Sequence, residues 1–191
     1  MKLLEEKILR DGRVLPGEIL KVDNFLNHQL DPALITALGQ EFYRLFSSYP
    51  ITKILTVESS GIAIAFAAAQ RFGVPVVFAK KGKHKNVGND LYTADVYSYT
   101  KGETYTVAVS KRYLGAGDQV LIIDDFLANG AAAEGLISIL DQAGAKLAGV
   151  GIAIEKGFQP GGKMLRDRGV HVESLSIIAS MTDDSISFAE Q

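Results

Sequence analysis

The spacing of hydrophobic and polar residues switches repeatedly between a strand-like and a helix-like pattern along the chain. Five short, almost continuous apolar runs are typical of buried strands: 52–57, 74–79, 119–124, 147–155 and 171–178. Helical spacing is found between or before most of these runs: 2–10, 31–47, 61–72, 131–143 and a short stretch near 163–168. This alternation predicts an α/β fold with a mainly parallel sheet flanked by helices.

Two regions interrupt the alternation. Residues 80–93 form a long polar stretch, and the two strand-like segments that follow it, 94–100 and 103–110, predict an antiparallel hairpin. Residues 18–30 mix apolar, amide and charged side chains without a clean period. Since the chain has no internal repeat and no linker, we expect a single domain over residues 1–191.

Composition narrows the classes of function. The chain has no cysteine, which excludes a disulfide scaffold and a thiolate metal site, and which fits a reducing, cytoplasmic compartment. A net charge of −2 gives no general attraction to nucleic acid. The acidic first residues do not predict a secretion signal, and the longest apolar run, 61–69, is too short to span a bilayer. The three histidines have no metal-like spacing, so no residue is predicted to be a protein ligand of a metal.

The strongest chemical signal runs from residue 120 to residue 132. An apolar strand ends at two adjacent acids, Asp124 and Asp125, and a turn of small residues then begins a helix: Ala128, Asn129, Gly130, Ala131 and Ala132. The first N–H groups of a helix have no intrahelical partner and lie at the positive end of its dipole, so this turn can bind phosphate. A ribose 5-phosphate fits both parts, because its diol can donate to the acids while its phosphate binds the turn. The alternative, an ordinary strand end and an Asn-Gly turn, explains each part but not the whole pattern.

This segment resembles the phosphoribosyl-diphosphate signature of the type I phosphoribosyltransferases, which has an apolar strand, two acids, an apolar pair and a small-residue phosphate loop. The similarity extends along nearly the whole chain and includes three further segments: 19–29, 58–62 and 154–161. Many members of the family have a Thr-Gly-Gly-Thr type of loop where this chain has Asn129-Gly130-Ala131-Ala132. Without those hydroxyl groups, backbone amides would do more of the phosphate binding.

The resemblance implies an N-terminal hood at about residues 14–30 and an antiparallel hairpin flap at about residues 80–110. It implies transfer of the 5-phosphoribosyl group from 5-phosphoribosyl 1-diphosphate (PRPP) to a purine in purine salvage, with release of pyrophosphate. Xanthine is the predicted base, giving xanthosine monophosphate (XMP), and hypoxanthine, guanine and adenine are the alternatives. The resemblance also implies Mg²⁺ held mainly through PRPP, and a cytoplasmic homodimer without nucleic-acid or membrane partners. A more distant alternative is a PRPP-sensing transcription regulator, which would need a basic partner-binding domain.

The resemblance assigns roles to individual residues. Asp124 and Asp125 would orient the ribose diol and stabilise positive charge on the ring, and residues 128–132 would bind PRPP. Four residues would form the pyrophosphate loop, although they also fit an ordinary helix start capped by serine: Glu58, Ser59, Ser60 and Gly61.

The resemblance assigns base recognition to Leu20, Asn27 and Lys156. Leu20 would pack on a face of the xanthine ring, and the Asn27 amide could both donate and accept hydrogen bonds. The backbone or the side chain at Lys156 would meet the exocyclic oxygen. Phe158 or Phe25 could stack on the ring, and core packing is the alternative for both and for Leu20. The basic run at 80–85 would supply countercharge from the flap, or else form a solvated face.

Overall fold

The computed structural model describes residues 1–82, 90–98, 102–182 and 185–190. The helices of this part are α1 (Lys2–Asp11), α2 (Pro32–Phe46), α3 (Gly61–Phe72), α4 (Ala131–Ala143) and α5 (Gly161–Asp167), with a π-helix at Asp23–Asn27. The strands are β1 (Arg13–Leu15), β2 (Ile19–Lys21), β3 (Lys53–Val57), β4 (Val76–Lys81), β5 (Leu91–Ser98), β6 (Glu103–Ser110), β7 (Gln119–Leu127), β8 (Lys146–Lys156), β9 (Val172–Thr182) and β10 (Ser185–Phe188).

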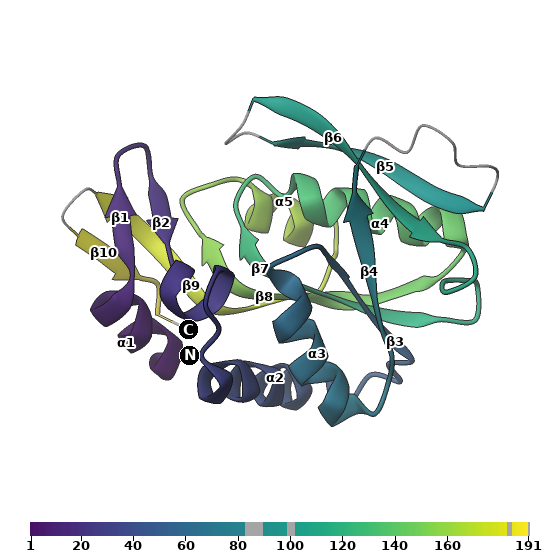
Figure 1. Ribbon diagram of the computed structural model, residues 1–191, viewed down its shortest axis with the longest axis horizontal. Coiled ribbons are helices and arrows are strands. Elements are labelled where there is room, and N and C mark those ends of the chain that lie inside the picture. The colour runs from purple at the N-terminus through teal and green to yellow at the C-terminus, as the bar shows by residue number, and fades with distance from the viewer. Residues whose placement is uncertain (83–89, 99–101, 183–184, 191) are drawn as a thin grey trace.

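One large twisted sheet forms the centre of the molecule (Figure 1). Its parallel part has the order β9-β8-β7-β3-β4. Antiparallel strands extend both edges: β10 pairs with β9 at one edge, and the β5–β6 hairpin joins β4 at the other. The predicted α/β fold with a mainly parallel sheet is therefore confirmed.

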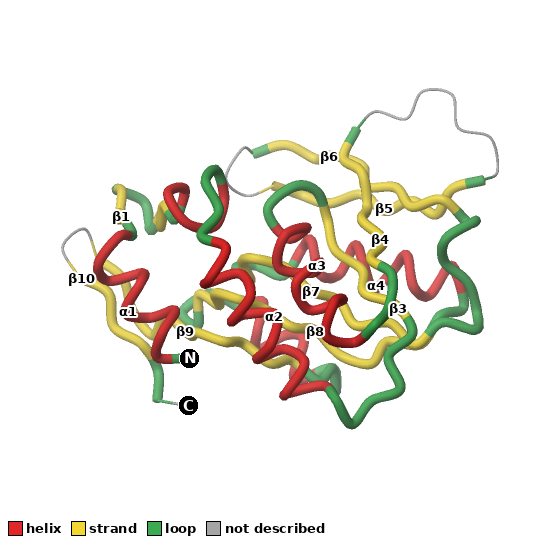
Figure 2. Tube along the Cα trace, turned by 60° about the horizontal axis from the view of Figure 1, so that its bottom comes forward, coloured by secondary structure: helices red, strands yellow, loops and turns green. Residues whose placement is uncertain are grey.

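Helices cover the two faces of the sheet, and the alternation of side chains along β7 shows how. Leu121 and Ile123 pack in one hydrophobic cluster with α1, α2 and α3, which lie in front of the sheet in Figure 2. Val120 and Ile122 pack in a second cluster with α4 and α5. A strand buried on both faces needs this continuous apolar sequence, because its successive side chains point in opposite directions.

The helix boundaries follow from local sequence. The carboxylate of Asp31 accepts hydrogen bonds from the backbone N–H groups of Ala33 and Leu34, and Pro32 occupies the first position of α2. Gly73 and Gly144 adopt left-handed conformations that end α3 and α4. No helix in the described part of the chain is long and apolar enough to cross a bilayer.

Strand ends differ more from the sequence-based boundaries. β7 continues to Leu127, because Phe126 and Leu127 stay in the parallel ladder opposite Ile154 and Glu155 of β8. The two acids therefore lie inside the strand, and not at its last position. β4 likewise extends to Lys81 through pairing with β6, so the polar stretch predicted at 80–93 is shorter than expected. The lysines and histidine of the basic run beyond residue 82 lie outside the described residues.

The irregular N-terminal stretch contains structure that its mixed pattern did not predict. β1 and β2 form a small antiparallel hairpin, and the π-helix follows it. Leu20, Phe25 and Leu26 are buried in the cluster of α1, α2 and α3. Burial of these apolar side chains therefore holds the segment against the edge of the molecule near β9 and β10 (Figure 1).

Candidate active site

The turn between β7 and α4 has the geometry of an anion site. Gly130 has a φ of 87°, a conformation that favours glycine, and a Cβ atom there would lie 3.2 Å from the backbone Cα of Gly161. No side chain of the described residues caps the N-terminus of α4. The first N–H groups of the helix are thus available to a ligand, as the sequence predicts.

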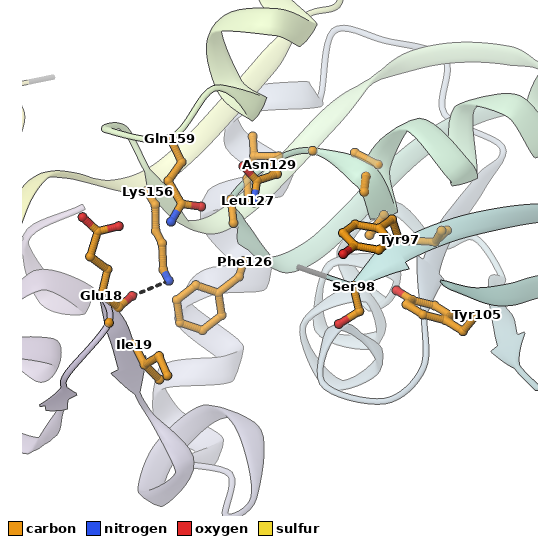
Figure 3. A pocket seen from close by; sticks show the side chains of 17 residues that line it. Glu18, Ile19, Tyr97, Ser98, Tyr105, Phe126, Leu127, Asn129, Lys156 and Gln159 are labelled. Carbon is orange, nitrogen blue, oxygen red and sulfur yellow. Dashed lines mark hydrogen bonds between the residues drawn. The ribbon is translucent and has the colours of Figure 1, made fainter. Parts of the chain in front are cut away.

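A cavity of about 440 Å³ opens beside this turn (Figure 3). Four separate parts of the chain form its wall: the tip of the β1–β2 hairpin, the end of β5 with Tyr105 of β6, the segment from Phe126 to Ala133, and Lys156 with Gln159 after β8. The turn before α4, the β1–β2 hairpin and the β5–β6 hairpin therefore meet at one place. This is the carboxyl end of the central strands, where α/β sheets bind ligands.

The two acids lie directly before the cavity-lining residue Phe126. Asp124 is buried, with 6% of its surface exposed, and its Oδ1 accepts a hydrogen bond from the backbone N–H of Asp125 at 2.9 Å. Burial, and next the charge of Asp125, raise the pKa of Asp124 well above its ordinary value. Burial and then the charge of Asp124 also raise the pKa of Tyr105, which lines the cavity. A cationic group bound here would offset this excess of negative charge.

The segment from Glu58 to Gly61 connects β3 to α3 and lies against the acids. A Cβ atom on Gly61 would be 2.9 Å from Oδ1 of Asp124 and 2.2 Å from Oγ1 of Thr56. The carboxylate of Glu58 accepts a hydrogen bond from the backbone N–H of Lys81 at 2.6 Å, which ties the segment to the end of β4. These four residues, like Asp124 and Asp125, are not among those that line the 440 Å³ cavity.

Lys156 is the predicted base contact that lines the cavity. Its Nζ donates to the carbonyl oxygen of Glu18 at 2.7 Å, and burial lowers its pKa below the ordinary value. The preceding residue, Glu155, is buried and paired with both terminal nitrogens of Arg166, at 2.8 and 2.7 Å, and it also accepts from Ser174. This pair, in which Glu155 is buried and Arg166 is exposed, fixes the backbone from which Lys156 extends.

Leu20 and Asn27 are not among the cavity-lining residues. Leu20 packs in the core with 6% of its surface exposed, beside the lining residue Ile19. Asn27 ends the π-helix, and its Oδ1 atom is buried without a hydrogen-bond partner among the described residues. Phe25 is 1% exposed and lies in the core, and Phe158 packs against the same cluster, which agrees with the core-packing alternative for both.

Several cavity residues were not singled out from the sequence. Tyr97, Ser98 and Tyr105 come from the β5–β6 hairpin, and Gln159 comes from the segment after β8. The alternation of polar and apolar residues along β5 and β6 does not indicate which face of the hairpin lies against the turn before α4. Gln159 lies inside the family-like segment 154–161, so the resemblance was the one available signal for it.

The chain is similar in sequence to proteins of known family. A family model described as a phosphoribosyl transferase domain matches residues 21–185. The chain belongs to this phosphoribosyl transferase family, and the family predicted from the sequence is confirmed.

Curated relatives give a narrower comparison. Xanthine phosphoribosyltransferase of Ruminiclostridium cellulolyticum is 58% identical over 190 residues, covering 100% of both chains. The protein of the same name from Latilactobacillus sakei is 56% identical over 191 residues, covering 100% of this chain and 98% of its own.

Solved structures agree on the fold. The Giardia lamblia APRTase complexed with 9-deazaadenine has a TM-score of 0.74 at 23% identity, covering 91% of this chain and 96% of its own. Adenine phosphoribosyltransferase of Rhodothermus marinus also has a TM-score of 0.74 at 23% identity, covering 93% and 99%. At this identity the likeness concerns the fold alone.

Proposed function

We propose that this protein transfers the 5-phosphoribosyl group from PRPP to xanthine, giving XMP and pyrophosphate in purine salvage. The observation that carries the proposal is the uncapped N-terminus of α4, which opens on the same cavity as Lys156. A helix start that can bind phosphate and a half-buried cation that can donate to a base oxygen line the same cavity, which supports binding of one nucleotide there. The similarity to xanthine phosphoribosyltransferases along the whole chain supports the choice of base.

The donor binds through three groups in this proposal. The 5-phosphate accepts hydrogen bonds from the backbone N–H groups of Ala128 to Ala132, Asp124 and Asp125 accept from the ribose diol, and the segment from Glu58 to Gly61 holds the diphosphate. Departure of pyrophosphate leaves positive charge on the ribose ring. The carboxylates beside the ring stabilise that charge, since fixed groups of opposite sign act most strongly in a buried site.

The residues present fit a Mg²⁺ ion that is held mainly by PRPP. Among the described residues there is no group of three or more His, Asp or Glu side chains that could hold a metal by themselves. Two adjacent carboxylates are hard oxygen ligands of the kind that Mg²⁺ accepts alongside substrate oxygens and water. When bound, the ion would neutralise the diphosphate and so make it a better leaving group. Asp124 and Asp125 are the residues that would contact it or its waters.

The base occupies the side of the cavity that Lys156 forms. The ammonium group of Lys156 donates to the exocyclic oxygen at C6 of xanthine, and Leu20 lies beneath the ring. The NH₂ group of the Asn27 side chain donates a hydrogen bond to the oxygen at C2. An unpaired buried polar group costs about 1–3 kcal/mol. Hypoxanthine, which has no oxygen at C2, would leave this donor unpaired.

The surrounding segments complete the proposal. Residues 14–30 act as the hood and residues 80–110 as the flap of one domain that spans 1–191. The protein acts as a homodimer, since Phe66, Phe78 and Tyr113 are large side chains with 57%, 39% and 61% of their surface exposed. The cytoplasm is the expected compartment, because the multiply charged donor does not cross a membrane unaided.

An assay of nucleotide formation tests the function. Purified protein, PRPP and Mg²⁺ are incubated with xanthine, hypoxanthine, guanine or adenine, and the products are separated by chromatography. We expect XMP as the main product. Preference for another base would refute the xanthine assignment, and no nucleotide with any base would refute the phosphoribosyl transfer itself.

The Asn27→Ala variant tests base selection in the same assay. It should lower kcat/KM for xanthine about tenfold more than for hypoxanthine. Asn24→Ala is the matched control, because the Asn24 amide bonds the carbonyl oxygen of Asp11 outside the cavity. Equal losses on both bases would show that Asn27 positions the hood and does not read C2.

A further inference from the structure

The side chain of Gln159 is a cavity-lining amide whose oxygen lacks a partner. Its Oε1 atom is buried and makes no hydrogen bond with any described residue. The backbone N–H of Gln159 donates to the carbonyl oxygen of Lys156 at 2.9 Å, so the two side chains leave the same tight turn. Leaving such an oxygen unpaired in a buried place costs free energy. A ligand that offers a hydrogen bond at this point would recover that free energy.

The backbone around Gln159 is fixed against the phosphate turn. The N–H of Gly161 donates to the carbonyl oxygen of Ala128 at 3.0 Å. A Cβ atom on Gly161 would lie 2.4 Å from that oxygen and 2.6 Å from the backbone nitrogen of Gly130. Two backbone segments this close leave no room for the segment to shift, so Gln159 stays in the wall between Lys156 and Asn129 (Figure 3).

The chemistry of a purine determines which atom faces this wall. The exocyclic oxygen at C6 and the ring nitrogen N7 lie side by side on one edge of the base, and the neighbouring N9 bonds to the ribose. With Lys156 at the oxygen on C6, a group next to Lys156 on the side of the phosphate turn meets N7. The pyrimidine edge, with N1 and the oxygen at C2, points the other way.

We infer that the side-chain amide of Gln159 hydrogen-bonds N7 of the purine, an inference that rests on the proposed function. A half-turn of the terminal amide exchanges its oxygen and its NH₂ group. The oxygen accepts from N7–H of the free base, and the NH₂ group donates to N7 of the nucleotide. Gln159 can therefore bind N7 in both of its protonation states.

This contact would also direct the bond that forms. A base held as its N7–H tautomer presents the lone pair of N9 to the ribose. N9 then bonds to C1, the bond from C1 to the diphosphate oxygen breaks, and the proton on N7 leaves to the released pyrophosphate. Gln159 holds the tautomer and does not itself take the proton, because a neutral amide is too weak a base.

The test compares xanthine with 7-deazaxanthine, which has a C–H group in place of N7. In the wild type, the inhibition constant of 7-deazaxanthine should exceed the KM of xanthine about tenfold, which corresponds to the roughly 1.4 kcal/mol of one hydrogen bond. In Gln159→Met, which keeps the volume but removes the amide, this ratio should fall to near one. Gln159→Glu keeps an acceptor for N7–H and should retain part of the discrimination.

Two controls make the result specific. Discrimination against 1-methylxanthine, which is altered on the pyrimidine edge, should be the same in the wild type and in Gln159→Met. Gln40→Met, at an exposed position of α2, should leave all three constants unchanged. The inference would be overturned if a folded Gln159→Met kept the wild-type ratio of the 7-deazaxanthine inhibition constant to the xanthine KM. It would also be overturned if Gln159→Met lost discrimination against 1-methylxanthine and kept discrimination against 7-deazaxanthine.

Failure of the proposed function would be distinguishable. If the wild type acted on another purine, the same ratio would be measured with that base and its 7-deaza analogue, since N7 is common to all purines. Loss of the ratio in Gln159→Met would then support the N7 contact even though the assignment of xanthine had failed.

Discussion

Gly61→Ala probes the packing between the loop after β3 and the acids of β7. The new methyl group would lie 2.2 Å from Oγ1 of Thr56, 2.9 Å from Oδ1 of Asp124 and 3.5 Å from the Cα of Asp124. The first contact is far below van der Waals distance, and Thr56 is completely buried. The helix start, or the side chains beneath it, must therefore move by several tenths of an ångström.

Overpacking of this kind costs about 1–3 kcal/mol of the free energy of unfolding. For a chain of this size, 1 kcal/mol lowers Tm by about 2–4 °C, so we expect a fall of roughly 2–12 °C. Transfer should fall more steeply than stability, because the displaced Asp124 carboxylate contacts the ribose in the proposed mechanism. A displacement near 1 Å in such a site can cost about a hundredfold in rate.

A double-mutant cycle separates the two effects. Oγ1 of Thr56 has no hydrogen-bond partner among the described residues, so Thr56→Ala makes room without breaking a bond. Added to Gly61→Ala, it should restore about 0.5–2 kcal/mol of stability, as a coupling energy between touching residues. Activity should stay low, since the contact with Asp124 remains. Gly115→Ala, with nothing within 4 Å, is the control for an added methyl group. A Gly61→Ala variant with wild-type Tm and turnover would refute the reasoning.

Three further predictions concern other parts of the site. Asp124→Asn should abolish transfer and raise Tm. The increase in Tm should be absent below pH 3.8, the ordinary pKa of an aspartate, and should grow as the pH rises toward the raised pKa of Asp124 in the folded protein. Thermal unfolding followed from pH 4 to 8 checks this. Glu155→Gln should cost about 1–3 kcal/mol at pH 7 and raise KM for the base more than for PRPP, measured by denaturant unfolding and steady-state kinetics. Because hydrogen bonds from Arg166 and Ser174 outweigh burial and lower the pKa of Glu155, its stabilisation should be lost only as the pH falls below 4.5. Gly130→Ala should raise KM for PRPP at least tenfold. Gly102→Ala is the control, because Gly102 also has a positive φ but lies in open space. Both variants should lose about 1–2 kcal/mol of the free energy of unfolding, and Gly102→Ala should leave KM unchanged.

The parts of the fold that the sequence predicted well are those governed by local interactions. Gly61–Phe72 and Ala131–Ala143 have the predicted boundaries, because glycines with left-handed φ end both helices. Pairing between distant segments decided the other boundaries. Lys80 and Lys81 belong to a strand only because Ala108 and Val107 lie opposite them, which no local pattern reveals.

The site shows the same division. The phosphate turn is encoded in a single continuous segment, so its residues were predictable together. The wall facing it is assembled from residues near 17–19, 96–98 and 156–159, which are far apart in sequence. Polar residues such as Gln159 have no distinguishing pattern of their own, and their role depends on which backbone segments pack against the turn.

Different interactions hold the two walls of the cavity, the one next to β8 and the one formed by the β1–β2 hairpin. On the side of β8, the ion pair of buried Glu155 with Arg166 and the close packing of Gly161 on Ala128 hold the backbone in place. A hydrogen bond from Nζ of Lys156 to the carbonyl oxygen of Glu18 joins the β1–β2 hairpin to that wall. An ammonium group has three donors, so Lys156 can bind this carbonyl and a base oxygen together. In the proposed function, the same cation would join the β1–β2 hairpin to the bound base.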